Sequence, residues 1–225
     1  MLFRSTFYCR VYPYIRNKII TISNGVDLNV FKPLIKSQCR KELGYNATNR
    51  ILLYVGRLEK EKNLFFLLEV YKIVKLKIPE CRLVIVGSGT EETALIEKAK
   101  SENLTNIDFV GEVKNSDLPK YINCADVFAF CSLFEGSPII IREVLACNVP
   151  VVSLDVGDVK TLIKQFDGCA ISPNNTTVFA TRICEILEQR QTFNYQHLSH
   201  IFSSKEAYYK TLEKYNSVFY GENHF

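Results

Sequence analysis

Two glutamates, Glu135 and Glu143, stand with seven residues between them in the stretch FEGSPIIIREVLACNVPVVS, residues 134–153. A carboxylate accepts hydrogen bonds through both of its oxygens, so two carboxylates placed around one ligand would suit a molecule rich in hydroxyl groups, such as a sugar. The alternative is that Glu143 belongs to the exposed polar face of a helix and Glu135 is an ordinary loop residue. From this stretch alone, the two interpretations are equally supported.

The residues between the glutamates predict the start of a helix that faces a ligand. Ser137 is a favourable N-cap residue, and Pro138 suits the first helical position. Gly136 would let the backbone approach a ligand closely. The free N–H groups of Ile139 and Ile140 would then form an anion site together with the helix dipole. A phosphate would therefore fit at the helix start, between the two carboxylates.

Two other loops add groups that could bind phosphate or a flat ring. Arg57 and Lys62 lie in GRLEKEKN, residues 56–63, where Arg offers a fork of donors and Lys a mobile point charge. Taken alone, both would be read as solvated loop charges. Gly87 and Gly89 in VIVGSG would allow a tight turn and the close approach of a flat group. The third glycine of a dinucleotide-binding fingerprint is absent, so the stretch does not predict NAD binding.

Short apolar runs alternate with helical patterns along the chain, and this alternation predicts how the loops are positioned. We predict strands over residues 51–56, 81–89, 106–111, 126–132, 149–155 and 168–172. We predict helices over residues 63–78, 91–102, 116–125 (capped by Ser116), 137–147, 158–166 and 176–189. Apolar strands that alternate with helices indicate a doubly wound parallel α/β sheet of the Rossmann-like class. Ligands of such sheets bind beyond the carboxyl ends of the strands, where the loops described above would meet.

Taken in order, the motifs resemble the carboxyl-terminal half of a GT-B glycosyltransferase of family GT4, a large retaining group. The segments that carry the resemblance are ISNGVDLNVFKP (22–33), GRLEKEKN (56–63), VIVGSG (84–89), NIDFVGEVKNSDLPKYINCADVFAFCS (106–132) and EGSPIIIRE (135–143). The last of them matches the Glu-x7-Glu motif of the family, and the resemblance covers roughly residues 20–220. Three positions depart from the family pattern: Thr90 and Cys131 stand for Pro, and Asn148 for Gly. Asn is the best replacement for Gly at a positive φ, which we expect at position 148.

The resemblance implies a role for each charged position. Arg57 and Lys62 would hold the diphosphate of the donor, Glu135 would contact the hydroxyls of the donor sugar, and Glu143 would bind those of the ribose. The chain has no Asp-x-Asp motif and the family generally uses no metal, so we expect no metal site and no cofactor. The two cations and the helix dipole would instead offset the charge of the leaving diphosphate, since stabilisation of developing charge typically contributes more to catalysis than any other single effect.

The resemblance also implies the surroundings of the ligand. Gly136, Ser137 and Pro138 would bring the amides of Ile139 and Ile140 to the distal phosphate. Val113 and Asn115 would border the base. The reaction implied is transfer of a sugar, with retention, from a UDP-, GDP- or ADP-sugar to a glycan or lipid acceptor, in the synthesis of glycans or surface polysaccharides.

We expect three parts in the chain. Residues 1–20 would be the stub of an amino-terminal domain, residues 21–202 the nucleotide-sugar-binding domain, and residues 203–225 a terminal helix and tail that in the family crosses back to the amino-terminal domain. That helix would open with a capping box, Ser203 with Glu206. Its apolar stripe consists of Tyr208, Leu212, Tyr215 and Phe219, and would promote self-association or capture of a partner that supplies the amino-terminal half.

Three interpretations of the function remain open at this point. The chain could be the donor half of a glycosyltransferase, one subunit of a split transferase, or a nucleotide-binding module without catalysis. The presence of Arg57, Lys62, Glu135 and Glu143 together favours the first two, because a binding remnant would not need Glu135.

Composition limits the classes of partner and compartment. The formal charge of +4 is too small to indicate nucleic-acid binding. The eight cysteines contain no C-x-x-C pair and read as small buried side chains in a reducing compartment. His197, His200 and His224 lie near the end, outside any motif, and are expected on the surface. Basic residues interrupt the apolar runs of the amino-terminal segment, which predicts neither a signal peptide nor a spanning helix. We expect a cytoplasmic protein, with peripheral attachment to the membrane surface as the alternative.

Overall fold

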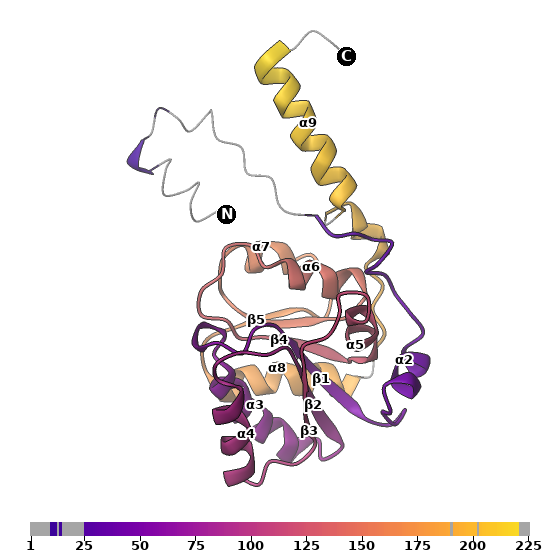
Figure 1. The fold of residues 1–225 in the computed structure, drawn as a ribbon, viewed down its shortest axis with the longest axis vertical. Coiled ribbons are helices and arrows are strands. Elements are labelled where there is room, and N and C mark those ends of the chain that lie inside the picture. The colour runs from indigo at the N-terminus through magenta and orange to yellow at the C-terminus, as the bar shows by residue number, and fades with distance from the viewer. Residues whose placement is uncertain (1–9, 13, 15–24, 190, 202, 221–225) are drawn as a thin grey trace.

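The structure, a computed structural model, describes residues 10–12, 14, 25–189, 191–201 and 203–220, and its centre is one parallel sheet of six strands (Figure 1). The strands run in the order β3-β2-β1-β4-β5-β6. Their bounds are β1 Arg50–Val55, β2 Cys81–Val86, β3 Ile107–Gly111, β4 Val127–Phe130, β5 Val151–Leu154 and β6 Ala170–Ser172. The predicted doubly wound, Rossmann-like α/β fold is confirmed.

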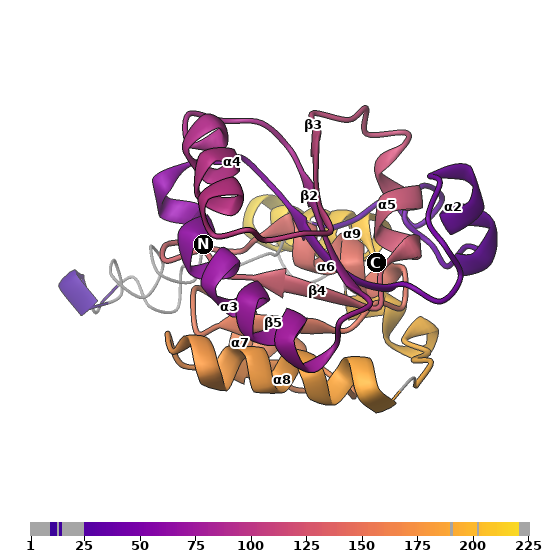
Figure 2. The same ribbon diagram turned by 90° about the horizontal axis from the view of Figure 1, so that it is seen from below.

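Helices cover both faces of the sheet (Figure 2). One face carries α3 (Leu64–Lys77), α4 (Glu92–Ser101) and α8 (Thr176–Gln189), and the other carries α5 (Leu118–Cys124), α6 (Ile139–Ala146) and α7 (Val159–Ile163). Successive residues of β1 alternate between the two cores: Ile51 and Leu53 join the α6 side, while Leu52 and Tyr54 join the α3 side. Because both faces are covered, β1 is apolar along almost its whole length, as the sequence pattern predicted.

The strand order changes direction between β1 and β4. These two strands are neighbours in the sheet, with Leu52 beside Val127 and Leu53 beside Phe128, although β2 and β3 separate them in the sequence. Such a topological switch point leaves a crevice beyond the carboxyl ends of the two strands, because the loops that follow them turn to opposite faces of the sheet. The loop with Arg57 and the loop with Glu135 both start at this point.

Two of the predicted helix caps are wrong. Helix α6 begins at Ile139, and its N-cap is Pro138 and not Ser137, whose hydroxyl donates to Asp158 instead. Helix α5 has Asp117 and not Ser116 at its N-cap, without a side-chain hydrogen bond. Local sequence cannot decide between a serine that caps its own helix and one that bonds to a distant carboxylate. The positive φ expected at Asn148 is confirmed, at 62°.

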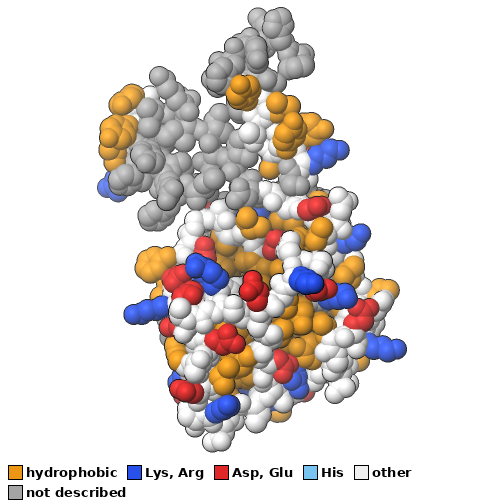
Figure 3. Space-filling view, in the orientation of Figure 1, with side chains coloured by type: hydrophobic (Ala, Val, Ile, Leu, Met, Phe, Trp, Pro, Cys, Tyr) orange, Lys and Arg blue, Asp and Glu red, His pale blue; other side chains and the backbone are white. Residues whose placement is uncertain are grey.

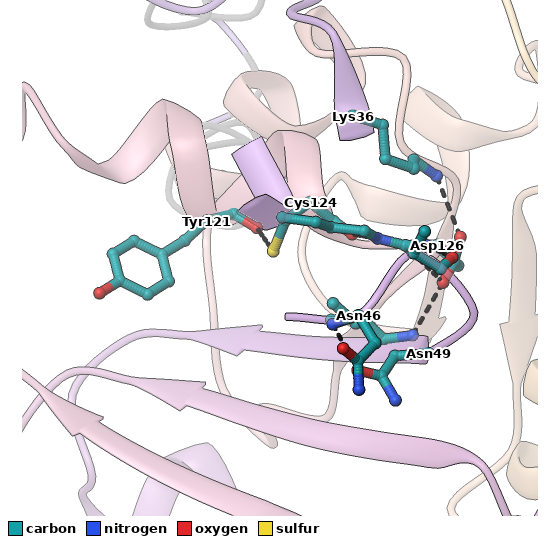
Figure 4. A network of polar contacts seen from close by, with 9 residues as sticks. Lys36, Asn46, Asn49, Tyr121, Cys124 and Asp126 are labelled. Atoms are coloured by element: carbon teal, nitrogen blue, oxygen red, sulfur yellow. Dashed lines mark hydrogen bonds and ion pairs between the residues drawn. The ribbon is translucent and has the colours of Figure 1, made fainter. Parts of the chain in front are cut away.

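A partly buried polar network holds the amino ends of β1 and β4 together (Figure 4). Asp126 accepts hydrogen bonds from the backbone N–H of Ile51 at 2.8 Å, from Arg40 Nη2 at 2.7 Å and from Lys36 Nζ at 3.1 Å. Lys36 and Arg40 belong to α2 (Lys36–Glu42), a helix that the sequence pattern did not predict. The network lies at the amino ends of the strands, whereas the ligand loops follow their carboxyl ends, so it supports the fold and not the site.

Helix α9 (Ser204–Tyr220) extends away from the sheet and its covering helices (Figure 1). The backbone N–H of Glu206 donates to Ser203 Oγ at 3.4 Å, which is one half of the predicted capping box. Tyr208, Leu212 and Tyr215 are 62%, 40% and 53% exposed, as expected for the apolar stripe, whereas the side chain of Phe219 lies outside the described residues. No helix in the described part of the chain is long and apolar enough to cross a membrane.

The cysteines and histidines agree with their prediction where they are described. Six of the seven described cysteines are buried, and burial raises the pKa of their thiols, so they are small apolar core residues. His197 is exposed. Cys9, His224 and the side chain of His200 lie outside the described residues, and so does nearly all of the predicted stub, residues 1–20.

Candidate functional site

The loops that follow β1 and β4 are joined across the switch point. Lys62 Nζ forms an ion pair with Glu135 Oε1. The backbone N–H of Leu133 donates to the carbonyl of Glu61 at 2.8 Å, and Cys131 Sγ donates to the carbonyl of Lys62 at 3.2 Å. Three contacts therefore fix one loop against the other, and they bring together two residues, Lys62 and Glu135, that the sequence predicted to share a site.

The Lys62–Glu135 pair is mostly shielded from solvent. Its side chains are 15% and 21% exposed, and Ser132 Oγ adds a second donor to Glu135 at 3.4 Å. Burial raises the pKa of the neighbouring Cys131 thiol to about 12, so this side chain stays protonated and can donate to the loop. A lysine in such a partly desolvated position interacts more strongly with an anion than a lysine in bulk water.

Arg57 differs from Lys62 in its surroundings. Its side chain is 72% exposed and forms an ion pair with Glu61 at 3.2 Å, four residues further along the chain. Its backbone carbonyl accepts a hydrogen bond from Tyr54 at 3.0 Å, which holds the start of the loop on the core. The guanidinium is therefore free to reorient toward a ligand, whereas the Lys62 ammonium is already held in place.

The N-terminus of α6 follows the loop that carries Glu135, with Pro138 only three residues after that glutamate. Pro138, the N-cap, makes no side-chain capping bond, and the N–H groups of Ile139 and Ile140 have no acceptor among the described residues. The first amides of a helix have no partner within the helix, and together with its dipole they favour an anion. The two amides are therefore open, as an anion site would require, although the cap differs from the predicted one; the anion site itself stays a prediction.

Glu143 is the fifth residue of α6 and is partly buried. Burial raises the pKa of its carboxyl group to about 7. Its side chain makes no hydrogen bond or ion pair with another described residue, so nothing in this part of the chain offsets the loss of solvation. A carboxylate in this situation would gain from a ligand that donates hydrogen bonds to it.

A cavity of about 200 Å³ opens at the carboxyl ends of β1, β2 and β3. Its walls are mainly apolar, from Val55, Val86, Val113 and Leu118, and its polar rim consists of Arg57, Ser88 and Glu112. A mainly apolar cavity with a few polar groups suits an aromatic ring such as a nucleobase. Val113 lines this cavity, whereas Asn115 is exposed and does not; that either residue borders a base stays a prediction.

The two glycines of VIVGSG serve contacts between strand ends. A Cβ on Gly87 (φ 128°) would lie 2.0 Å from the carbonyl oxygen of Gly56, and one on Gly89 would lie 2.5 Å from that of Leu58. The backbone after β1 thus packs directly on the backbone after β2, and side chains at 87 and 89 would separate them. The flat group that these glycines admit is in the first place the neighbouring peptide backbone, although Gly87 also lines the cavity.

Sequence reasoning missed two buried charges beneath the site, Arg142 and Asp158. Arg142 Nη2 donates to Asp158 Oδ2 at 2.7 Å, and the two side chains are 3% and 6% exposed. A signal was available, because Arg142 interrupts the apolar run IIIREVLA, and a charge within such a run needs a partner. Ser88 and Glu112 were missed as well, although each follows soon after the end of a strand.

Charges of both signs are interspersed on the face of the molecule drawn in Figure 3, with apolar side chains between them. Within the described residues, no group of three His, Cys, Asp or Glu side chains is arranged to hold a metal ion. The candidate site consists of the ion-paired ammonium of Lys62, the exposed guanidinium of Arg57, the N-terminus of α6, the carboxylates of Glu135 and Glu143, and the apolar cavity. This set can bind a molecule that combines a flat ring, hydroxyl groups and a strongly anionic group.

Comparison with known proteins gives a consistent result. The family model described as glycosyl transferases group 1 matches residues 36–200. A putative teichuronic acid biosynthesis glycosyltransferase of Bacillus subtilis, TuaC, is 32% identical over 161 residues, which are 71% of this chain and 39% of that protein. The chain therefore spans well under two thirds of this relative.

Two solved structures show the same fold. The crystal structure of Anabaena Alr3699/HepE in complex with UDP and glucose superposes with a TM-score of 0.74 at 22% identity, over 87% of this chain and 56% of that one. The C-terminal domain of a group 1 family protein, LpcC, from Francisella tularensis superposes with a TM-score of 0.63 at 18% identity, over 85% of this chain and 98% of that one. At these identities the likeness concerns the fold alone.

Proposed function

Because this chain belongs to the group 1 glycosyltransferases, we propose that its sheet domain binds the nucleotide-sugar donor of a retaining sugar-transfer reaction. The observation that carries the proposal is the contact between the loops after β1 and β4. Lys62 and Glu135 meet there at the topological switch point, beside the open N-terminus of α6 and the apolar cavity. A diphosphate, a sugar and a base need these three kinds of surroundings side by side.

In this proposal the base enters the cavity beside Val113, and the diphosphate lies between Arg57, Lys62 and the amides of Ile139 and Ile140. Arg57 would turn from Glu61 to the phosphates, which is feasible because the side chain is largely exposed. As the bond from sugar to phosphate breaks, negative charge develops on the leaving diphosphate. The preplaced ammonium and the helix dipole would stabilise that charge without reorganising, and such electrostatic stabilisation usually lowers the barrier more than any other single effect.

The two glutamates have different partners in the proposal. Glu135 would accept hydrogen bonds from hydroxyls of the transferred sugar, and its ion pair with Lys62 would keep it oriented toward them. Glu143 would accept bonds from the ribose hydroxyls, which would offset the desolvation of its carboxylate. In this proposal, Glu135 contributes to binding of the sugar, and Glu143 contributes to binding of the nucleoside.

The proposal assigns donor binding alone to the described residues. The acceptor would be a glycan or lipid, and the product a surface polysaccharide or related glycan, by analogy with the teichuronic acid relative. Closure over the sugar and contact with the acceptor would need further protein, from the same polypeptide or from a partner subunit. The likeness to a C-terminal domain of a group 1 protein supports this division.

The test is a binding screen on the 225-residue chain with UDP, GDP, ADP and their sugars, read as a thermal shift and then by calorimetry. We expect one of the three bases to stabilise the protein, since a ligand that binds only the folded state raises its stability by mass action. Lys62→Met should abolish most of that shift. Lys98→Met, which removes another ion-paired lysine far from the cavity, is the matched control and should leave the shift intact. No shift with any of the three diphosphates would refute the proposal.

A further inference from the structure

The buried pair of Arg142 and Asp158 lies beneath the loop that carries Glu135. Arg142 is on α6, and Asp158 is the residue before α7, so the pair joins two helices that follow different strands of the sheet. Both residues are buried, at 2% and 6% exposure. None of the functional roles proposed above uses either of them.

The pair holds three consecutive residues of the loop between β4 and α6, which also carries Glu135 and is called the donor loop below. The backbone N–H of Asp158 donates to the carbonyl of Gly136 at 3.1 Å. The hydroxyl of Ser137 donates to Asp158 Oδ2 at 2.8 Å, and Arg142 Nη1 donates to the carbonyl of Pro138 at 3.4 Å. The loop between Glu135 and the start of α6 is thus fixed residue by residue.

Two side chains that could cap a helix are bonded to each other instead. Asp158 occupies the N-cap of α7 but makes no capping bond there. Ser137 stands next to the N-cap of α6 and has a hydroxyl that could reach the free amides of that helix. The Ser137 hydroxyl is directed to Asp158 and accepts no hydrogen bond from an amide of α6, so the first N–H groups of the helix stay open for a ligand.

The turn that leads to Asp158 fits closely under the same loop. Gly157 has φ 56°, and a Cβ there would lie 2.3 Å from the carbonyl oxygen of Gly136 and 2.7 Å from that of Glu135. No side chain could be accommodated without displacing the loop that carries the glutamate. The turn before α7 therefore packs directly against the backbone of the donor loop and supports it.

The energetics of the pair also point to a geometric role. Arg142 Nε and Asp158 Oδ1 are buried, and neither has a hydrogen-bond partner among the described residues. A buried ion pair that is incompletely hydrogen-bonded stabilises a fold little compared with a well-packed apolar pair. What an apolar pair could not supply is the two directed side-chain bonds, from the Ser137 hydroxyl to Asp158 and from Arg142 to the carbonyl of Pro138.

We propose that Arg142 and Asp158 are positioning residues for the donor phosphates. They hold the Glu135 loop in place and keep Ser137 away from the N-terminus of α6, so that the amides of Ile139 and Ile140 face the diphosphate. This inference rests on the proposed function. It adds a requirement that the family resemblance did not imply: two buried residues without access to the ligand decide how well its phosphates bind.

The test compares a nucleoside diphosphate with its nucleoside, because only the diphosphate would reach the loop. UDP and uridine are titrated into the parent chain and into Asp158→Asn, with GDP and guanosine or ADP and adenosine as the pair if the parent prefers another base. We expect Asp158→Asn to weaken binding of the diphosphate at least tenfold and to change binding of the nucleoside less than twofold. If Asp158 contributed only to stability, Asp158→Asn would either weaken the binding of both ligands by the same factor or leave both unchanged.

Two further variants keep the test decisive. Arg142→Met combined with Asp158→Leu replaces the pair by apolar side chains, which removes the buried charges and should leave the chain folded. It should show the same selective loss of diphosphate affinity. Asp126→Asn is the matched control, because Asp126 forms a similar pair with Arg40 at the opposite edge of the sheet. It should lower the melting temperature and leave the ratio of the two affinities unchanged.

The outcomes separate the two levels of inference. If the parent binds none of the diphosphates, the proposed function fails and this inference with it. Suppose that the parent binds a diphosphate, and that the ratio of the affinities for diphosphate and nucleoside is the same in the parent, in Asp158→Asn and in the variant with the apolar pair. The positioning role is then wrong, while the proposed function stands. A selective loss in both variants supports the role.

Discussion

Replacing Glu143 by Gln should make the protein more stable at pH 8 and leave its stability nearly unchanged at pH 5. Burial raises the pKa of this carboxyl group from its ordinary value of 4.5 to about 7. Between these two values the folded protein holds a proton that the unfolded chain has released, so stability falls as the pH rises through this window and stays lower above it. Gln resembles the protonated form and does not ionise.

The size of the effect follows from the pKa and the exposure. A pKa shift of one unit corresponds to about 1.4 kcal/mol, so the whole shift of the Glu143 pKa would lower the free energy of unfolding by about 3 kcal/mol at pH 8. The side chain of Glu143 is only partly buried, and we halve that figure for solvent screening, to about 1–2 kcal/mol. For a chain of this size, 1 kcal/mol shifts the melting temperature by about 2–4 °C, so Glu143→Gln should melt about 2–8 °C higher than the parent at pH 8.

The assay is differential scanning calorimetry of both proteins at several values between pH 5 and pH 8.5, without ligand. The difference in melting temperature should grow with pH, with its steepest change between 5 and 7. Glu97→Gln, at an exposed position of α4, is the control and should show no such growth. The reasoning is refuted if Glu143→Gln is less stable than the parent at pH 8, because Glu143 would then have a stabilising partner as an anion.

Three other results are expected from the site and from α9. Lys62→Ala should weaken UDP binding by about 1.5–3 kcal/mol, measured by calorimetry. Arg57→Ala should weaken it by less, because the exposed guanidinium is better solvated. Equal losses of UDP affinity in the two variants would contradict this reasoning from burial. Glu135→Gln should weaken UDP-glucose but not UDP, whereas Glu143→Gln should weaken both alike; a loss of UDP affinity in Glu135→Gln would move this residue to the nucleotide. Leu212→Glu should reduce self-association in light scattering, since the exposed apolar stripe of α9 would be interrupted; a parent that is already a strict monomer would contradict this.

Much of the fold could be read from local sequence. The strands are short apolar runs, and the helices begin and end close to the predicted residues; α8, for example, spans the predicted 176–189. The Asn148 backbone was predictable as well, because few residues tolerate a positive φ. These features depend on hydrophobic periodicity and backbone preference, which act over a few neighbouring residues. Helix α2 was missed because KSQCRKE has no apolar periodicity.

The composition of the candidate site was also visible in the sequence. Arg57, Lys62, Glu135 and Glu143 all follow the carboxyl ends of predicted strands, and the parallel topology implied by the strand–helix alternation places such loops at one edge of the sheet. The sequence pattern therefore indicated which residues could bind phosphate and sugar hydroxyls, and at which ends of the strands they lie; the nucleotide-sugar was implied by the family resemblance. Family resemblance added the individual roles, which remain predictions.

Only the tertiary structure decided how these residues meet. The pairing of Lys62 with Glu135 depends on β1 lying beside β4, a contact between strands far apart in the sequence. The diversion of Ser137 to Asp158, and the difference in exposure between Arg57 and Lys62, depend in the same way on which loops become neighbours. Local patterns cannot encode these features, because strand order is set by packing of the whole sheet and because a polar side chain bonds to whatever partner that packing brings within reach.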